Sequence, residues 1–330
     1  MTTASPYVLE ELRKEARMGA AGSETTARPV PVIDLSDFDA RRDEITEQLW
    51  RAATEVGFFQ LSHHGIPLAQ VREAFAMSER FFALPRETKA QWPIARNAGW
   101  ESLSQVRPST GVPDQKESYQ MTRPRMAGLY PSEAELPGFK AAMQAFEDAS
   151  WAVGMRVLSC FADKLGFDRD FFTRAHDMGR DTYQSTLRLL HYYPIPTDVQ
   201  DKLDYVRGGA HTDFNCLTLL YQREGQGGLQ VCPGKEFEAR AWTPVPPDEA
   251  LITCNIGDML MRWSDDRLLS NFHRVRNPLP GEYMGGRYSI AFFCQANTDA
   301  VIASPSGKYP PITAGDYLAE RMKANYQKKY

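Results

Sequence analysis

Residues 208–222 read GGAHTDFNCLTLLYQ and have the character of a buried β-strand except at their front edge. The apolar run that contains Leu217, Leu219 and Leu220 is preceded by His211 and Asp213, which lie two positions apart. On a strand, side chains at i and i+2 project to the same face, so this imidazole and this carboxylate point together. Because burying such groups is costly unless a partner compensates them, the pattern suggests a metal ion as that partner.

The segments around this stretch predict an antiparallel β-fold. After Thr182 the apolar residues recur with a period of two, in 185–194 (STLRLLHYYP), 227–233 (GGLQVCP), 250–260 (ALITCNIGDML), 271–275 (NFHRV) and 287–295 (RYSIAFFCQ). Short strands at such spacing, with Gly and Pro between them, favour a closed or sandwich-like sheet. Helical spacing predicts helices at 44–56, 68–82, 138–165 and 316–326.

Four regions follow from this order of elements. We expect an arm or linker in residues 1–28, a region of helices and strands in residues 29–180, the β-rich core in residues 181–300, and a closing helix within residues 301–330. The fold class is therefore α+β, with a β core flanked by helices.

Composition and charge exclude several classes of protein. The net charge of −4 gives no electrostatic reason to expect nucleic acid or an anionic membrane as a partner. No apolar run is long enough to span a bilayer, and the N-terminus lacks the apolar core of a secretory signal. Five cysteines, an odd number without a CxxC pair, are typical of reduced thiols in the cytoplasm.

His273, in a second strand-like run, strengthens the metal hypothesis. A histidine and an aspartate two positions apart arise easily by chance among six histidines, so the first pair alone proves little. Two imidazoles and one carboxylate on one face of an octahedral ion suit Fe(II) with open positions for oxygen chemistry. A hydrogen-bonded core histidine remains the alternative for His273 taken alone.

Arg287 and Ser289 share one face of a later strand and indicate a bound anion. A buried arginine without an acidic partner carries a desolvation cost, and this strand supplies no acidic side chain. A small dicarboxylate would meet the need, gripped by the guanidinium of Arg287 and hydrogen-bonded by the hydroxyl of Ser289. A structural surface arginine is the alternative.

The order HxD, then a distant His, then RxS resembles the non-haem Fe(II), 2-oxoglutarate-dependent oxygenases, and in particular the branch that includes isopenicillin N synthase. PVIDLSDF, TEVGFFQLSHHGIP and ERFFALPRETK resemble the amino-terminal region of that branch. LHYYP, AHTDFNCLTLLYQ, GGLQV, NIGDMLMRWSDDRLLSNFHRV and RYSIAFF resemble its catalytic half. The resemblance covers residue 30 to about residue 300.

This resemblance implies a fold, an activity and a set of ligands. The fold is a distorted double-stranded β-helix (jelly roll), and the activity is oxidation of a small molecule by O2 with release of succinate and CO2. His211, Asp213 and His273 would hold Fe(II). Arg287 and Ser289 would bind the far carboxylate of 2-oxoglutarate, and Tyr193 would hydrogen-bond that same carboxylate.

Six further residues are candidates for contact with the substrate. His191 stands where many relatives have asparagine, and Asn215 shares the inward parity of the strand that carries the ligands. Phe293 is a candidate wall of the pocket, although core packing explains it equally well. Arg107, Lys116 and Tyr119 fall where this branch often lines its cavity, with Arg107 as the candidate for an anionic substrate.

Other functions remain open at this level. An isopenicillin N synthase-like oxidase would keep the iron without using 2-oxoglutarate, and an ethylene-forming enzyme would fragment 2-oxoglutarate itself. A metal-binding jelly roll that senses a ligand is the non-enzymatic alternative. Substrate identity and oligomeric state do not follow from the sequence, since specificity depends on loops and pocket shape.

Overall fold

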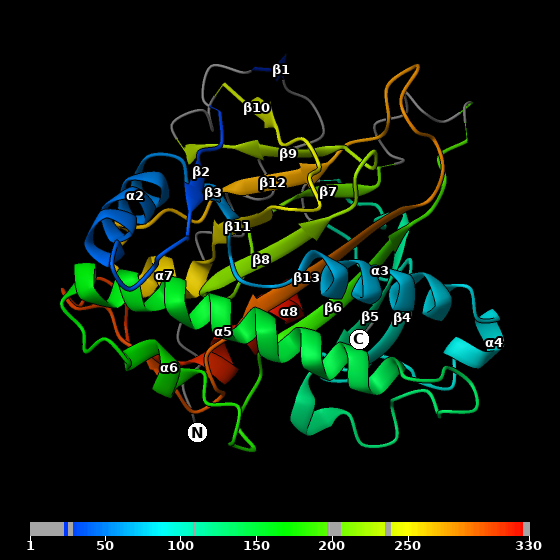
Figure 1. The fold of residues 1–330 in the computed structure, drawn as a ribbon, viewed down its shortest axis with the longest axis horizontal. Coiled ribbons are helices and arrows are strands. Elements are labelled where there is room, and N and C mark those ends of the chain that lie inside the picture. The colour runs from blue at the N-terminus through cyan, green and yellow to red at the C-terminus, as the bar shows by residue number, and fades with distance from the viewer. Residues whose placement is uncertain are drawn as a thin grey trace.

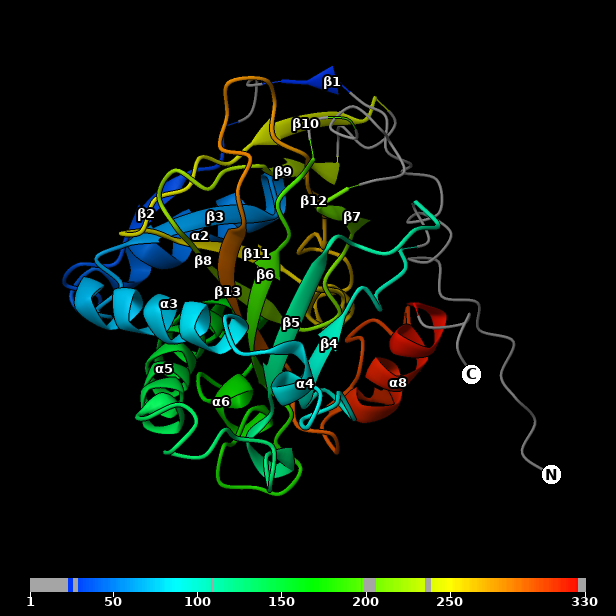
Figure 2. The same cartoon turned by 90° about the vertical axis from the view of Figure 1, so that its right-hand side faces the viewer.

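The computed structural model describes residues 23–25, 29–107, 110–196, 198, 206–234 and 239–325. Two β-sheets lie one against the other, and helices pack on the outer side of the larger sheet (Figure 1, Figure 2). Most of the arm expected in residues 1–28 lies outside the described residues. Within that arm, Ser23–Glu24 forms strand β1, which pairs in parallel with β10.

The stretch 208–222, expected to be one strand, is divided between the two sheets: Leu217–Gln222 is strand β8 of the larger sheet, and Gly208–His211 is strand β7 of the smaller one. The strands of the larger sheet run antiparallel apart from the parallel pair β2 and β3. Their order is β2 (Val32–Asp34), β3 (Phe58–Ser62), β11 (Ile252–Ile256), β8 (Leu217–Gln222), β13 (Arg287–Cys294), β6 (Thr186–Tyr192), β5 (Lys116–Met121) and β4 (Gly99–Ser102).

The smaller sheet brings together strands that carry candidate ligands. Its order is β1 (Ser23–Glu24), β10 (Ala241–Pro244), β9 (Leu229–Cys232), β12 (Phe272–Val275) and β7 (Gly208–His211). A separate two-stranded ribbon joins β14 (Val301–Ile302) to β15 (Ile312–Thr313).

Helices pack where the apolar periodicity predicts them. The predicted helices at 44–56, 68–82 and 138–165 correspond to α2 (Arg42–Glu55), α3 (Leu68–Phe82) and α5 (Phe139–Leu165). α5 ends where Gly166 adopts a φ of 78°, a left-handed conformation that favours glycine. The other helices are α4 (Arg86–Lys89), the 3₁₀ turn η1 (Arg123–Arg125), α6 (Phe171–Ala175), α7 (Asp258–Trp263) and α8 (Ala314–Asn325).

The period of two divides the larger sheet into two faces. On β8, Leu217, Leu219 and Tyr221 belong to the core packed under the helices, whereas Thr218 and Leu220 line a pocket. β13 alternates in the same way: Ile290, Phe292 and Cys294 join the core, and Arg287, Ser289, Ala291 and Phe293 line the pocket. The strand pattern therefore places polar chemistry on one face and hydrophobic stabilisation on the other.

The expected region boundary at residue 180 does not separate two sheets. Strands β2 to β5 come from residues 29–180, yet they join the same larger sheet as the strands of residues 181–300. The closing helix expected within residues 301–330 corresponds to α8. In the part of the chain that the structure describes, no helix combines the length and apolar character needed to cross a bilayer.

Candidate active site

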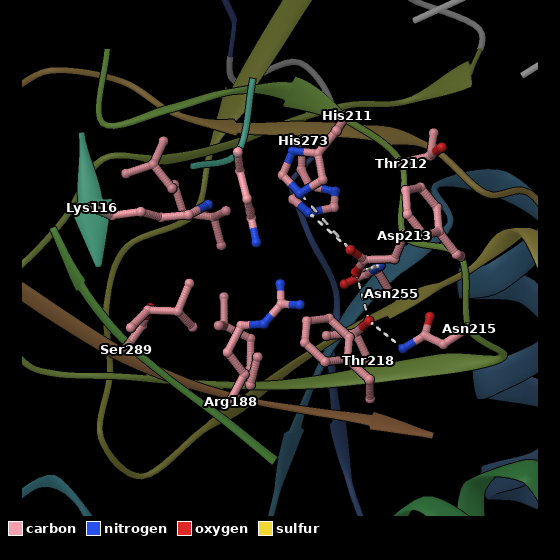
Figure 3. Close-up of a pocket in the computed structure, with 18 of the residues that line it drawn as sticks. Lys116, Arg188, His211, Thr212, Asp213, Asn215, Thr218, Asn255, His273 and Ser289 are labelled. Atoms are coloured by element: carbon pink, nitrogen blue, oxygen red, sulfur yellow. Dashed lines mark hydrogen bonds and ion pairs between the residues drawn. The ribbon is translucent and has the colours of Figure 1, made fainter. Parts of the chain in front are cut away.

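A pocket opens between the two sheets and collects side chains from both (Figure 3). Its empty space measures about 1150 Å³, part of which lies at the open mouth. Strands β3, β5, β6, β8, β11 and β13 contribute from the larger sheet, and β7, β9 and β12 contribute from the smaller one.

Three candidate ligands, His211, Asp213 and His273, meet on one side of this pocket. Their ligand atoms all lie within 4.8 Å of one another. The Asp213 Oδ1 atom is 3.9 Å from Nε2 of His211 and 3.7 Å from Nε2 of His273. These separations are too long for hydrogen bonds, so three electron-pair donors converge without satisfying one another.

Sheet register explains why the two histidines meet. β12 pairs antiparallel with β7, and His273 stands opposite His211 in that pairing. The two imidazole ring centroids are 4.3 Å apart, and Phe58 packs edge-on against His273 at 5.7 Å. Asp213 follows the end of β7 by two residues, which brings its carboxylate to the same spot.

Both imidazoles are held in the neutral form that a metal requires. Burial, with Arg107 and His273 nearby, lowers the pKa of His211 well below its usual value. Burial also lowers the pKa of His273, although the Asp213 carboxylate opposes the shift. His211 Nδ1 donates to the Gly209 carbonyl at 2.8 Å, so its Nε2 keeps a free electron pair directed at Asp213.

The Asp213 carboxylate is oriented by two donors behind it. Thr218 Oγ1 donates to Asp213 Oδ2 at 2.6 Å, and Asn255 Nδ2 donates to the same oxygen at 2.8 Å. Asn215 in turn donates from Nδ2 to Thr218 Oγ1 at 2.9 Å. Oδ1 is therefore left to face the histidines, as expected for a carboxylate that binds a metal. Two neutral imidazoles and one oriented carboxylate fit Fe(II).

Gly257 secures the turn behind these residues. A Cβ atom added at this position would stand 2.2 Å from the Asn215 carbonyl oxygen and 2.3 Å from its Oδ1. We expect Gly257→Ala to lower the free energy of unfolding by about 1–3 kcal/mol, because the overpacked backbone cannot move aside. Urea denaturation measures this, with Gly227→Ala as the control, where the nearest contact is 3.8 Å. Equal stability of the two variants would contradict this packing.

Arg287 forms a second feature of the pocket. It is 1% exposed, and Nε donates to the carbonyl oxygens of Gln226 and Gly227 at 3.1 Å each. Nη1 donates to Ser289 Oγ at 3.3 Å, and Nη2 donates to Gln222 Oε1 at 3.4 Å. Within the described residues no carboxylate pairs with this guanidinium. A buried cation with only neutral partners favours an anionic ligand.

Tyr192, and not Tyr193, accompanies Arg287. In the pairing of β13 with β6, Arg287 stands opposite Tyr192, and its Cζ lies 4.8 Å from the Tyr192 ring centroid. The Tyr193 hydroxyl is instead 2.8 Å from Ser102 Oγ. The expectation for Tyr193 is therefore corrected: Arg188, Leu190 and Tyr192 face the pocket, so Tyr193 falls one residue out of phase.

The expectation that His191 contacts the substrate is also corrected, because His191, on the same side as Tyr193, lies on the face of β6 that points away from the pocket. Its Nδ1 lies 2.9 Å from Glu117 Oε1, and its ring stacks on Tyr288 with centroids 4.6 Å apart. His191 is absent from the residues that line the pocket. The ring serves the outer face of the larger sheet.

Tyr119 is likewise corrected from the pocket to the core. Its side chain is 0% exposed, its hydroxyl donates to the Leu129 carbonyl at 2.6 Å, and its ring packs 4.2 Å from that of Phe81. Lys116, three residues earlier on β5, does line the pocket. Residues three apart on a strand face opposite sides, so both could not point inward.

Asn215, Phe293 and Arg107 do line the pocket. Arg107 is engaged there, since its Nε lies 3.0 Å from Asp114 Oδ2 in an ion pair. Asp114 also contacts Lys116 Nζ at 2.7 Å and accepts the backbone N–H of Gly209 at 2.9 Å. Arg107 thus helps to brace the strand that carries His211.

Sequence reasoning missed several residues of this pocket. The alternation in residues 185–194 was a signal for three of them, because Arg188, Leu190 and Tyr192 share one face of β6. The others, which donate hydrogen bonds to the candidate ligand Asp213, left no local signal in the sequence; these are Thr218 and Asn255.

Two family models match the chain in succession. Residues 30–136 match the model described as non-haem dioxygenase in morphine synthesis N-terminal, and residues 184–296 match that of the 2OG-Fe(II) oxygenase superfamily. The second match spans the strands that carry the three candidate ligands and Arg287.

Full-length relatives and solved structures agree with these models. The chain is 33% identical to proline hydroxylase buaE of Petromyces alliaceus, over 89% of this chain and 98% of that protein. It is 32% identical to the 2-oxoglutarate-Fe(II) type oxidoreductase hxnY of Emericella nidulans, over 90% of each. A full-length Neurospora crassa protein, crystallised in complex with alpha-KG, is similar with a TM-score of 0.80 and 30% identity, covering 92% of this chain and 98% of that one.

A double-stranded β-helix core is common to this group, and the two facing sheets are this chain's version of it. The chain therefore belongs to the 2OG-Fe(II) oxygenase superfamily and is an oxidoreductase that uses Fe(II), 2-oxoglutarate and O2 to oxidise a small molecule.

Proposed function

We propose that His211, Asp213 and His273 bind the Fe(II) and that Arg287, with Ser289 and Tyr192, binds the distal carboxylate of 2-oxoglutarate. The observation that carries this assignment is the presence, in one pocket, of a buried guanidinium without an acidic partner and three unsatisfied metal-type donors. Iron and a dicarboxylate satisfy both features together.

Bound Fe(II) supplies the centre at which O2 and 2-oxoglutarate react, and the protein supplies position and charge. Thr218 and Asn255 hold the Asp213 carboxylate, so that Oδ1 stays directed at the ion. Arg287 neutralises the distal carboxylate, with Ser289 adding a hydroxyl group. Leu220, one of the apolar side chains that line the cavity, helps to keep water from the reacting groups.

The substrate occupies the part of the pocket that 2-oxoglutarate leaves free, and oxidation there releases succinate and CO2. Relatives bear names that indicate diverse small substrates: one is a proline hydroxylase, and the N. crassa protein was also crystallised with thymine. We place the chain in the isopenicillin N synthase-like branch, a placement supported by the match of its amino-terminal region. Five buried free cysteines support a reducing, cytoplasmic location.

Two assays test this function and separate the alternatives. Anaerobic addition of Fe(II) and 2-oxoglutarate is expected to give a weak visible absorption band, and in air carboxyl-labelled 2-oxoglutarate is expected to release CO2. If neither signal appears, a ligand sensor is favoured. Oxygen consumption with a substrate but without CO2 release would favour an oxidase that does not use 2-oxoglutarate. Ethylene in the headspace would favour fragmentation of 2-oxoglutarate itself.

A further inference from the structure

Arg188 is a cation in the pocket that neither the metal ligands nor the 2-oxoglutarate residues use. It projects from β6 toward the interior of the pocket (Figure 3). Its Nη2 donates to Gln120 Oε1 at 2.7 Å, and its Nε is buried without a hydrogen-bond partner. No described carboxylate forms an ion pair with it, and its guanidinium lies 4.9 Å from the Phe293 ring centroid. Most of its five N–H donors are therefore unused.

Arg188 and Arg287 enter the pocket at different places along the sheet. Along β6, Arg188 precedes Tyr192 by four residues, and Tyr192 stands opposite Arg287. At about 3.3 Å per residue, the two arginines attach to the sheet about 13 Å apart. Because the proposed function assigns Arg287 to 2-oxoglutarate, we assign the part of the pocket around Arg188 to another molecule and call it the second compartment.

The partners of Arg188 favour a negative charge on that molecule. The guanidinium donates to the amide oxygen of Gln120, and Gln120 Nε2 donates in turn to Glu101 Oε1 at 3.0 Å. Arg188 itself forms no ion pair among the described residues, so one carboxylate of a ligand would compensate its charge.

The remaining walls of the compartment are apolar, with two amides. Phe293 lies beneath the guanidinium, and Leu318 and Met322 reach the pocket from α8. Asn97 and Gln295 also line it, and the Asn97 carbonyl accepts from Thr122 beside the start of β6. This lining suits a compact hydrocarbon body and leaves Arg188 as the anchor for a charged end.

We propose that the substrate is a small monocarboxylic acid with an apolar body, and that Arg188 binds its carboxylate. This inference rests on the proposed function, since it assumes that 2-oxoglutarate occupies the Arg287 end. A guanidinium recognises a carboxylate through paired hydrogen bonds and loses most of that preference toward the neutral amide of the same acid. Arg188 is thus a specificity-determining residue, whereas Arg107 is already paired with Asp114.

Binding of matched acids and amides tests the proposal. The probes are hexanoate and phenylacetate, each compared with its own amide by calorimetry on anaerobic protein loaded with Fe(II) and 2-oxoglutarate. We expect at least one acid to bind at least 10-fold more tightly than its amide. In Arg188→Gln that ratio is expected to fall to within about 3-fold, whereas Arg188→Lys retains part of it. Arg72→Gln, an exposed arginine outside the pocket, is the matched control and keeps the full ratio.

Two results would overturn the assignment: no acid preferred over its amide by the unaltered protein, or a preference that survives in Arg188→Gln. Loading of the protein with 2-oxoglutarate is monitored separately in every variant through the visible band. If the protein shows this band but does not prefer the acid, the role of Arg188 is refuted and the proposed function is not. Absence of the band in the unaltered protein refutes the proposed function instead.

Discussion

Asp213→Asn is expected to weaken Fe(II) binding by more than about 100-fold while leaving the fold intact. Loss of a residue that only orients a metal ligand costs about 10- to 100-fold in affinity, so loss of the ligand itself costs more. The two donors behind Asp213 make the asparagine side chain of the variant an even poorer ligand than a neutral amide would otherwise be. Thr218 and Asn255 both donate to Oδ2, so the asparagine oxygen will turn toward them. Its NH2 group then faces the histidines, where it can only donate.

A series of variants with graded expected effects tests this prediction. The measurements are the iron content after dialysis and the visible absorption band that forms with 2-oxoglutarate. Thr218→Val removes one of the two donors to Asp213 and is expected to cost about 10- to 100-fold in iron affinity. Asp168→Asn, at a side chain that is 81% exposed, makes the same chemical change far from the metal and should bind iron normally. Iron bound stoichiometrically by Asp213→Asn would remove Asp213 from the ligand set.

Part of the candidate site was predictable from the sequence because strand geometry is regular. The rule that positions i and i+2 share a face put His211 beside Asp213, although β7 ends at His211 and Asp213 lies in the segment between β7 and β8. The same periodicity brings Arg287 and Ser289 to the pocket together. Helices α2, α3 and α5 follow just as directly from apolar residues at helical spacing.

The wrong expectations arose where residues were assigned to the site without checking which face of the strand their side chains occupy. Tyr193 directly precedes the proline of LHYYP, yet the pocket face of β6 carries Arg188, Leu190 and Tyr192. The expectation for His191 was wrong together with that for Tyr193, since the two share the opposite parity. Tyr119 was assigned to the cavity from its position in the chain, although Lys116 occupies the inward face of β5.

Long-range pairing explains what no local pattern could reveal. The donors Thr218 and Asn255 reach Asp213 because β8 and β11 are neighbours in the larger sheet. Arg107 is also far in sequence from the strand it braces through Asp114, whose Oδ1 accepts the Gly209 N–H. Such contacts depend on which strands meet, and strand order is set by the whole fold.

Arg287→Ala is expected to weaken 2-oxoglutarate binding by about 2–5 kcal/mol, the usual cost of removing one partner of a buried charge pair. This corresponds to a rise in Kd of about 30- to 5000-fold. The guanidinium is fully buried, and burial lowers its pKa, which shows how poorly neutral partners replace water around it. A carboxylate provides that compensation, so the arginine and the co-substrate gain from each other.

Thermal shift with increasing 2-oxoglutarate measures the loss in the Fe(II)-loaded protein under anaerobic conditions. A ligand at 100 times its Kd stabilises a protein by about 2.7 kcal/mol. At that same concentration a 30-fold weaker variant gains less than about 1 kcal/mol. Arg287→Lys keeps the charge but loses the planar pair of donors, and is expected to fall between the two. Iron binding itself should persist in both variants, because Arg287 contacts none of the three ligands. An unchanged 2-oxoglutarate affinity in Arg287→Ala would mean that the buried cation serves another anion.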